Sequence, residues 1–179
     1  MSVELIERAR SIAEERLSGQ SRRWAHVQGV AATMEQLAQS YPVTVREVLL
    51  AAAWLHDVGY SESVRDCGFH PVDGARFVLS QGFPELVASL IAYHTGATVE
   101  AEERGLTSEL APFTHPPTEL LDALTSADMM TGPDGVAVSP AARVEEILTR
   151  YPAEDPVHRA VSRSAPELLA AVARVKGRD

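Results

Sequence analysis

The sequence predicts a single all-α domain that occupies residues 1–179. Apolar residues recur every three to four positions in nearly every segment, which is the period of an amphipathic helix. No run alternates apolar and polar residues long enough to indicate a strand, and the chain has no internal repeat or low-complexity tract. With 179 residues, of which 45% are hydrophobic and 23% are charged, the chain is long enough to enclose one hydrophobic core.

Helix ends are predicted from capping residues, glycines and prolines. Ser21 is a candidate N-cap, and Thr44 followed by Glu47 is typical of a capping box. Gly59 suits the end of the third helix, and Pro166 is expected to divide the last helical region. A loop is expected at residues 61–69. The proline-containing stretch 98–117 is mixed, with a short helix around 100–104, and is interpreted either as a lid or as a plain connection. The expected helices are about 3–17, 21–40, 44–57, 71–82, 84–94, 100–104, 118–130, 139–150 and 155–177.

Charge and composition narrow the classes of function. The net charge of −9 disfavours a nucleic acid polymer as partner, because neutralising phosphates needs a basic surface. No apolar run approaches the roughly 20 residues of a membrane span, and the amino terminus lacks the apolar core of a secretory signal. The single Cys67 leaves no internal disulfide, so the expected compartment is the cytoplasm. A small phosphorylated substrate is compatible with this charge where a metal supplies positive charge.

Six titratable side chains occupy apolar helix faces, where packing alone would not place them. Taken singly, a histidine on such a face is more often a hydrogen-bonded core residue than a metal ligand. Taken together, they would bury several polar groups in one core, and a shared cation removes that free-energy cost. Imidazole and carboxylate donors suit Zn, Fe, Mn or Ni. The six residues are His26, His56, Asp57, His70, His94 and Asp128.

The adjacent His56 and Asp57 impose a stereochemical requirement. Neighbouring residues in a helix point about 100° apart, so two such side chains cannot converge on one site from the middle of a helix. At a helix end the backbone leaves this geometry, and Gly59 permits a sharp turn there. Because a carboxylate has two oxygens, Asp57 could bridge two metals.

In this order, the six residues resemble the H…HD…H…H…D pattern of the HD-domain superfamily of metal-dependent phosphohydrolases. The resemblance covers about residues 20–130, and the C-terminal helices of residues 131–179 lie outside it. It implies that the chain is one HD-type helical bundle with a metal site buried between the helices. The sequences that carry the resemblance are WAHVQGVA, WLHDVGY, FHPVDGARFV, IAYHTG and LTSADMM.

The resemblance also implies a reaction and a set of ligands. The expected activity is hydrolysis of a phosphoester or phosphoanhydride bond by a metal-bound hydroxide, with His56 and Asp57 as the catalytic pair. The small size and the HTG after the last histidine are similar to the symmetrical dinucleoside tetraphosphatase branch, which favours a nucleotide or dinucleotide substrate. The cofactors would be two divalent transition metal ions, Fe, Mn, Co, Ni or Zn. His26, His56, Asp57 and Asp128 would hold the first ion, and His70 and His94 would hold the second, with Asp57 bridging.

Five further residues are candidates for substrate binding. Two adjacent arginines lie within one turn of the first histidine, and a third lies in the loop after the HD pair. A guanidinium can grip a phosphate bidentately, although a solvated surface charge is the simpler interpretation of each. A tyrosine stands where many relatives have a lysine that can contact phosphate, and a threonine follows the last histidine. The candidates are Arg22, Arg23, Arg65, Tyr60 and Thr95.

Other polar residues are interpreted as structural. His115 and His158 are not expected to be metal ligands. Asp73 and Asp122 are expected to face solvent.

Two alternative functions share these sequence features. Some relatives with the same four histidines and two aspartates are di-iron oxygenases that cleave C–C or C–P bonds, and the ligands alone do not separate the two reactions. The other alternative is a non-catalytic, metal-binding helical module, for which a broken ligand set would be the sign, and the set here is intact. A homodimer would suit an exposed apolar face on Val3–Leu17 or on the C-terminal helix, although packing within a monomer accounts for either face equally well.

Overall fold

The computed structural model describes residues 2–177 and confirms the all-α prediction. Within these residues there is no strand, and a single isolated bridge joins Thr131 to Ala137. None of the described helices is long and apolar enough to cross a membrane. The helices are α1 (Ser2–Leu17), α2 (Ser21–Leu37), α3 (Val43–Leu55), α4 (His70–Ser80), α5 (Glu85–Tyr93), α6 (Ala97–Arg104), α7 (Thr107–Leu110), α8 (Thr118–Met129), α9 (Pro140–Arg150) and α10 (Pro156–Lys176), with short 3₁₀ turns η1 (Ala38–Ser40), η2 (Val58–Tyr60) and η3 (His94–Gly96).

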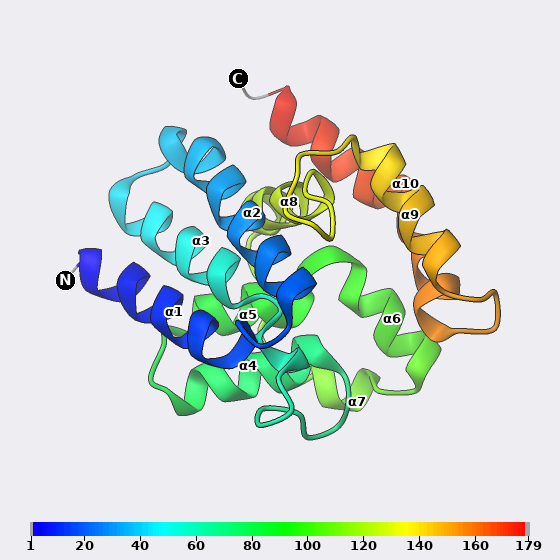
Figure 1. Ribbon diagram of the computed structural model, residues 1–179, viewed down its shortest axis with the longest axis horizontal. Helices are drawn as coiled ribbons and strands as arrows, with labels where there is room; N and C mark the ends of the chain where they lie inside the picture. The colour runs from blue at the N-terminus through cyan, green and yellow to red at the C-terminus, as the bar shows by residue number, and fades with distance from the viewer. Residues whose placement is uncertain (1, 178–179) are drawn as a thin grey trace.

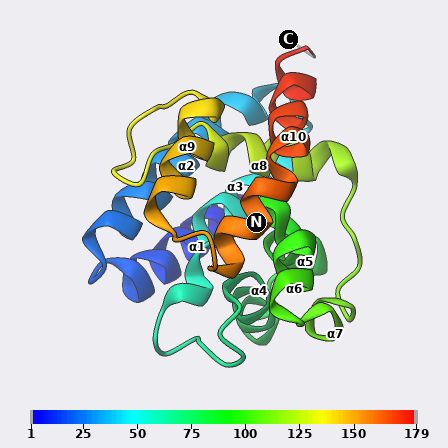
Figure 2. The same ribbon diagram turned by 90° about the vertical axis from the view of Figure 1, so that its right-hand side faces the viewer.

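Helix α3 lies between α1 and α2 in Figure 1. It packs against both of them and also against α5 and α8. Ala51, Ala52 and Ala53 are fully buried, and their small side chains let these neighbouring helices approach closely. The C-terminal helices α9 and α10 form a separate layer that covers α8 and α6 (Figure 2).

Two helices begin differently from the prediction. Helix α3 begins at Val43 after Pro42, so the capping box expected at Thr44 does not form. The N-cap of α2 is Gln20 rather than Ser21, and neither helix has a side-chain capping hydrogen bond. Pro42 is itself the N-cap of α3, and its ψ of 148° keeps the chain extended up to Val43, where the helix begins.

Pro166 does not divide the last helical region, contrary to the prediction. Helix α10 runs without interruption through Pro166, because its apolar face packs against α8 and α6 and outweighs the local effect of the missing N–H. An ion pair with a buried carboxylate also ties α10 to α8: Arg174 donates from Nε and Nη2 to Asp122 at 2.7 and 2.9 Å. Asp122 is therefore buried, and the prediction that it faces solvent is wrong.

The prediction for Asp73 is also wrong, because this residue is 1% exposed. Its carboxylate accepts hydrogen bonds from the backbone N–H groups of Asp66, Cys67 and Gly68. These bonds fold the loop of residues 61–69 onto the first turn of α4. The loop lacks regular secondary structure, and backbone N–H groups in it are bonded instead by one buried carboxylate.

We expect Asp73→Ala to lower the free energy of unfolding by about 2–3 kcal/mol, because backbone donors lose their acceptor in a partly buried loop. Urea denaturation followed by circular dichroism measures the change. Glu62→Ala, at an exposed position of the same loop, is the control and should stay within about 0.5 kcal/mol of the wild type. Equal stability of the two variants would show that the loop does not depend on Asp73.

Candidate metal centre

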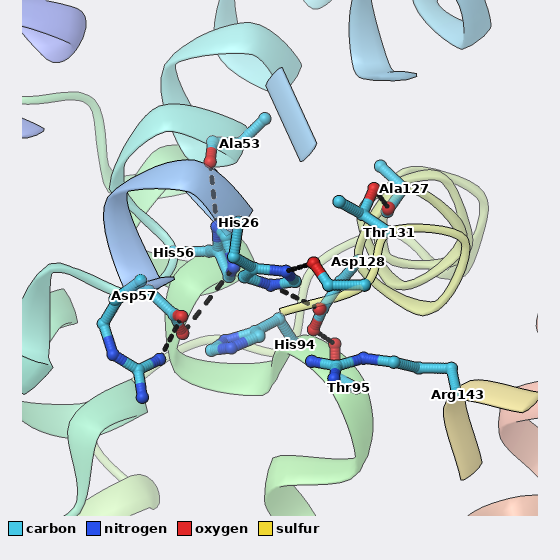
Figure 3. A network of polar contacts seen from close by, with 12 residues as sticks. His26, Ala53, His56, Asp57, His94, Thr95, Ala127, Asp128, Thr131 and Arg143 are labelled. Carbon is cyan, nitrogen blue, oxygen red and sulfur yellow. Dashed lines mark hydrogen bonds and ion pairs between the residues drawn. The ribbon is translucent and has the colours of Figure 1, made fainter. Parts of the chain in front are cut away.

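The six predicted ligands converge at one place in the bundle, although they come from five different helices or helix ends; Figure 3 labels all of them except His70. All but His26 stand at or next to the end of a helix, where backbone direction changes. They form two groups, and in each group one ligand atom per residue lies within 4.8 Å of the others. The first group is His26, His56 and Asp128, and the second is Asp57, His70 and His94.

Three of the four imidazoles are anchored through Nδ1. His56 and His94 each contact the carbonyl oxygen three residues earlier, at 2.8 and 2.6 Å, and His26 contacts the carbonyl oxygen of Gly132 at 3.0 Å. A carbonyl can only accept, so Nδ1–H donates in all three rings. In His56 and His94 this leaves the lone pair on Nε2, whereas His26 Nε2 lies 3.0 Å from the Asp128 carboxylate and carries a proton in that contact. This arrangement fixes the tautomer and ring direction of metal-ligating histidines.

The Nε2 atoms have the environment expected of ligands. His56 is fully buried, and its Nε2 has no hydrogen-bond partner among the described residues. His70 Nε2 and His94 Nε2 lie 3.3 Å apart and face each other. A buried, unpaired nitrogen such as His56 Nε2 is unfavourable in a protein core unless a further group binds it. A cation in each group would satisfy these atoms, so the residues present fit a metal site.

Asp57 lies between the two groups. Its Oδ1 is 3.6 Å from His56 Nε2 and also 3.6 Å from His70 Nε2. Helix α3 ends at Leu55, so the backbone at Asp57, with φ −100° and ψ 6°, has already left the helix. The adjacent His56 and Asp57 thereby reach different groups, and the end of α3 falls where the sequence predicts it.

A family model for the HD domain matches residues 23–130. The chain belongs to the HD-domain family. Proteins of this family are mostly metal-dependent hydrolases that bind divalent metals. Searches of curated proteins and of solved structures found no match. In this HD domain the matched region contains all six candidate ligands but ends before α9 and α10.

Gly59 serves close packing rather than the sharp turn that the sequence suggests. Its φ is not among the positive values found in the described chain. A Cβ atom at Gly59 would lie 2.0 Å from the carbonyl oxygen of His70 and 2.8 Å from the backbone N of Gly74. The missing side chain lets the first turn of α4 rest on η2, which brings His70 to the centre.

A second close approach holds the turn after α8 against α2. A Cβ atom at Gly29 would lie 2.4 Å from the carbonyl oxygen of Gly135, and one at Gly135 would lie 2.3 Å from the carbonyl oxygen of Ala25. The same turn presents the Gly132 carbonyl that anchors His26. The turn thus helps to fix one of the candidate ligands.

Arg23 and Tyr60 support the second group. Arg23 Nη1 donates to Asp57 Oδ2, and its guanidinium lies 3.5 Å from the ring centroid of Tyr60. The Tyr60 ring stacks in turn on His70, with a centroid distance of 4.0 Å and an interplanar angle of 19°. Tyr60 and Arg23 also line the cavity above the centre, but these contacts show that both hold ligands in place.

Thr95 lies against the first group. It is the one non-glycine residue with positive φ in the described chain, at 47°. Its Oγ1 donates to Asp128 Oδ2 at 2.5 Å, while Asp128 Oδ1 contacts His26 Nε2 at 3.0 Å. The strained backbone, which costs about 1–2 kcal/mol, is compatible with a role in orienting the Asp128 carboxylate.

The protonation states of His56, His70 and the two aspartates at the centre suit the binding of cations. Burial lowers the pKa of both His56 and His70, so these rings are neutral near pH 7, as metal ligands must be. Burial opposes ionisation of Asp57, but the fields of His56 and Arg23 hold its pKa well below the usual range. Burial likewise opposes ionisation of Asp128, and the hydrogen bond with His26 lowers its pKa below the usual range.

The other predicted binding residues divide into two kinds. Arg22 lines the cavity, whereas Arg65 is exposed on its loop and does not line it. Sequence reasoning missed Arg143, Arg150 and Tyr151, which line the cavity from α9 and the residue after it. The spacing of seven between the two arginines marks one face of a helix, but it does not say which helix that face meets.

We expect Gly59→Ala to displace the start of α4 and so reduce metal binding by the second group. The protein should lose about 1–3 kcal/mol of stability and retain less than the wild-type amount of metal. Metal content by mass spectrometry and urea denaturation check both effects. Gly177→Ala is the control, because its Cβ would make only ordinary van der Waals contacts. Wild-type metal content in Gly59→Ala would contradict this account.

The metal-free protein should lose stability as the pH falls from about 7.5 to about 5. The pKa values of His56 and His70 are lower in the folded than in the unfolded state, so the unfolded state takes up protons first. His26 acts in the opposite direction: burial disfavours its protonation, but Asp128 raises its pKa. The pKa of His70 lies well below its ordinary value, so His70 and His56 set the net direction.

Urea denaturation at several pH values, with a chelator present, measures this dependence. His70→Gln should flatten it, and His26→Gln should steepen it. His158→Gln, whose ring lies outside the centre and contacts the Tyr151 carbonyl, is the control. If His70→Gln and His158→Gln gave the same pH dependence, the buried neutral His70 would not be its source.

Proposed function

We propose that this HD-domain protein is a metal-dependent phosphohydrolase that cleaves a phosphoester or phosphoanhydride bond of a small substrate, a nucleotide or dinucleotide. The observation that carries the proposal is the pair of ligand groups that meet at Asp57 beneath a cavity of about 610 Å³. Family membership supports the reaction class, because HD-domain proteins are mostly metal-dependent hydrolases.

The donor set supports two divalent transition metal ions. Each group supplies two imidazoles and one carboxylate, which suits Fe, Mn, Co, Ni or Zn, and no cysteine is present in either group. When bound, such a pair of ions lowers the pKa of water and neutralises charge on a phosphoryl group.

The protein's own side chains orient the centre and shape the charge around it. Arg23 holds one oxygen of Asp57, which leaves the other near both groups. The anchored Nδ1 atoms keep the imidazoles from rotating when a substrate enters. Rigid ligands of this kind favour phosphoryl transfer, in which catalysis is mostly positioning and charge stabilisation.

The cavity favours a small anion. Four arginines line it, Arg22, Arg23, Arg143 and Arg150, although the chain as a whole carries a net charge of −9. Guanidinium groups pair well with phosphate oxygens. A volume of about 610 Å³ lies in the range of small-molecule sites, which supports a nucleotide-sized substrate over a polymer.

The test is a metal analysis followed by a panel of phosphomonoesters, nucleotides, cyclic dinucleotides and dinucleoside polyphosphates, each with Mn, Fe, Co, Ni and Mg. We expect metal-dependent phosphate release from at least one nucleotide. His56→Ala and Asp57→Ala should lower kcat more than about 100-fold and reduce bound metal, because each removes a direct ligand. His115→Ala is the matched control, because His115 lies outside both groups and contacts the Pro116 carbonyl.

Full activity and metal content in either ligand variant would overturn the site. Oxygen uptake with polyol or phosphonate substrates, in protein purified anaerobically with Fe, would assign the centre to oxygenase chemistry instead. A metal-loaded protein that is inert across the whole panel and consumes no oxygen would favour a binding module.

A further inference from the structure

One wall of the cavity comes from outside the region that matches the HD-domain model. Arg143 and Ile147 of α9 and Tyr151, the residue after it, follow one another at intervals of four residues, and all three line the cavity. Val157 and Val161 of α10 extend the same wall. The candidate ligands form the floor, so a substrate bound to the floor lies against this C-terminal wall.

Arg143 is an unusual member of the wall. It is only 7% exposed, and its Nη1 donates to Glu146 at 2.5 Å. Its Nε is buried and has no hydrogen-bond partner among the described residues. A buried guanidinium with an unpaired donor is unfavourable by itself, so a further acceptor is needed to complete it.

The guanidinium of Arg143 points toward Thr95 and Asp128, beside the first ligand group (Figure 3). Its charge helps to lower the pKa of Asp128 and opposes the protonation of His26. A cation cannot ligate a metal, and it repels one. A fixed positive charge next to a metal-binding group therefore favours an anion between the two.

We propose that Arg143 binds the phosphoryl group of the substrate and that Ile147 and Tyr151 contact its organic group. This inference rests on the proposed hydrolase function and extends it to residues beyond the matched region. The Nε and Nη2 atoms form one edge of the guanidinium, and a phosphoryl group presents two oxygens to such an edge. Glu146 occupies Nη1 and so holds the other side of the guanidinium.

The apolar part of the wall sets the class of substrate. A phosphate ion fills only a small part of a cavity of about 610 Å³. Ile147 and Val161 are buried, and the Tyr151 ring has the guanidinium of Arg150 5.0 Å from its centroid. An aromatic ring beside aliphatic side chains suits a flat, weakly polar group such as a nucleobase. The substrate is thus a phosphate ester or anhydride with a planar organic group.

The first test uses inorganic phosphate as the probe, titrated calorimetrically into the metal-loaded protein. We expect Arg143→Gln to weaken phosphate binding at least about tenfold and Arg143→Lys to weaken it less, because lysine keeps the charge but loses the bidentate edge. Arg163→Gln removes the same charge from an exposed position on α10 and should stay within about twofold of the wild type. Equal phosphate affinity in Arg143→Gln and Arg163→Gln overturns the proposal.

Metal content and the unfolding midpoint of each variant separate phosphate binding from a structural role. Weakened phosphate binding with wild-type metal content supports the proposal, whereas a parallel loss of metal overturns it. If Arg143→Gln does not fold, the Arg143→Lys comparison decides: unchanged phosphate affinity in that variant overturns the bidentate contact.

The second test concerns Tyr151. With the best substrate of the panel, Tyr151→Ala should raise KM at least about fivefold and leave the affinity for inorganic phosphate unchanged. An unchanged KM overturns the role of Tyr151. The calorimetric titration needs no turnover, so it tests phosphate binding separately from hydrolysis. If phosphate binding depended on Arg143 but the protein hydrolysed no substrate, the proposed hydrolase function would be refuted and the proposed phosphate site would stand. If Arg143→Gln released phosphate from the substrate as fast as the wild type, the hydrolase function would stand and the role of Arg143 would be refuted.

Discussion

The arrangement of this bundle depends on bringing four imidazoles and two carboxylates into one buried volume. Each ring must direct Nε2 to the same small space, while its Nδ1 still makes a hydrogen bond. Backbone carbonyls solve this for His26, His56 and His94, and the carbonyls sit where helices end or turn. The helix ends therefore have to meet at the centre, which explains why α3 is rich in alanine and why Gly59 has no side chain to separate it from α4.

Much of this organisation is predictable from the sequence because the signals are periodic or chemical. Apolar spacing locates the helices, and histidines on apolar faces identify the six residues that converge. Features that depend on a distant neighbour are not predictable in this way. Asp73 and Asp122 look like ordinary helix-surface acids until the loop of residues 61–69 and Arg174 are in place. Pro166 breaks a local rule, and only packing of α10 against its neighbours overrides it.

The candidate substrate contacts show the same limit more clearly. Thr95 and Tyr60 line the cavity, as predicted binding residues should, and they also contact Asp128 and His70, which the sequence does not predict. Arg65 is simply too far along its loop to line the cavity. The residues that do face the cavity from α9 have no motif of their own, since an arginine every two turns is common on solvated helices. Only the tertiary structure, which places α9 over the candidate ligands, shows that these residues line the cavity.

The turn after α8 bears on where this protein can be divided. The matched family region ends at residue 130, yet the carbonyl that anchors His26 belongs to Gly132, and the contact between Gly29 and Gly135 seats that turn on α2. A boundary drawn at the end of the match would pass through the scaffolding of the centre itself. A gene fusion, truncation or domain swap that is meant to preserve the centre would have to keep this turn together with the helices before it. This holds whether or not α9 and α10, which form the C-terminal wall, are kept.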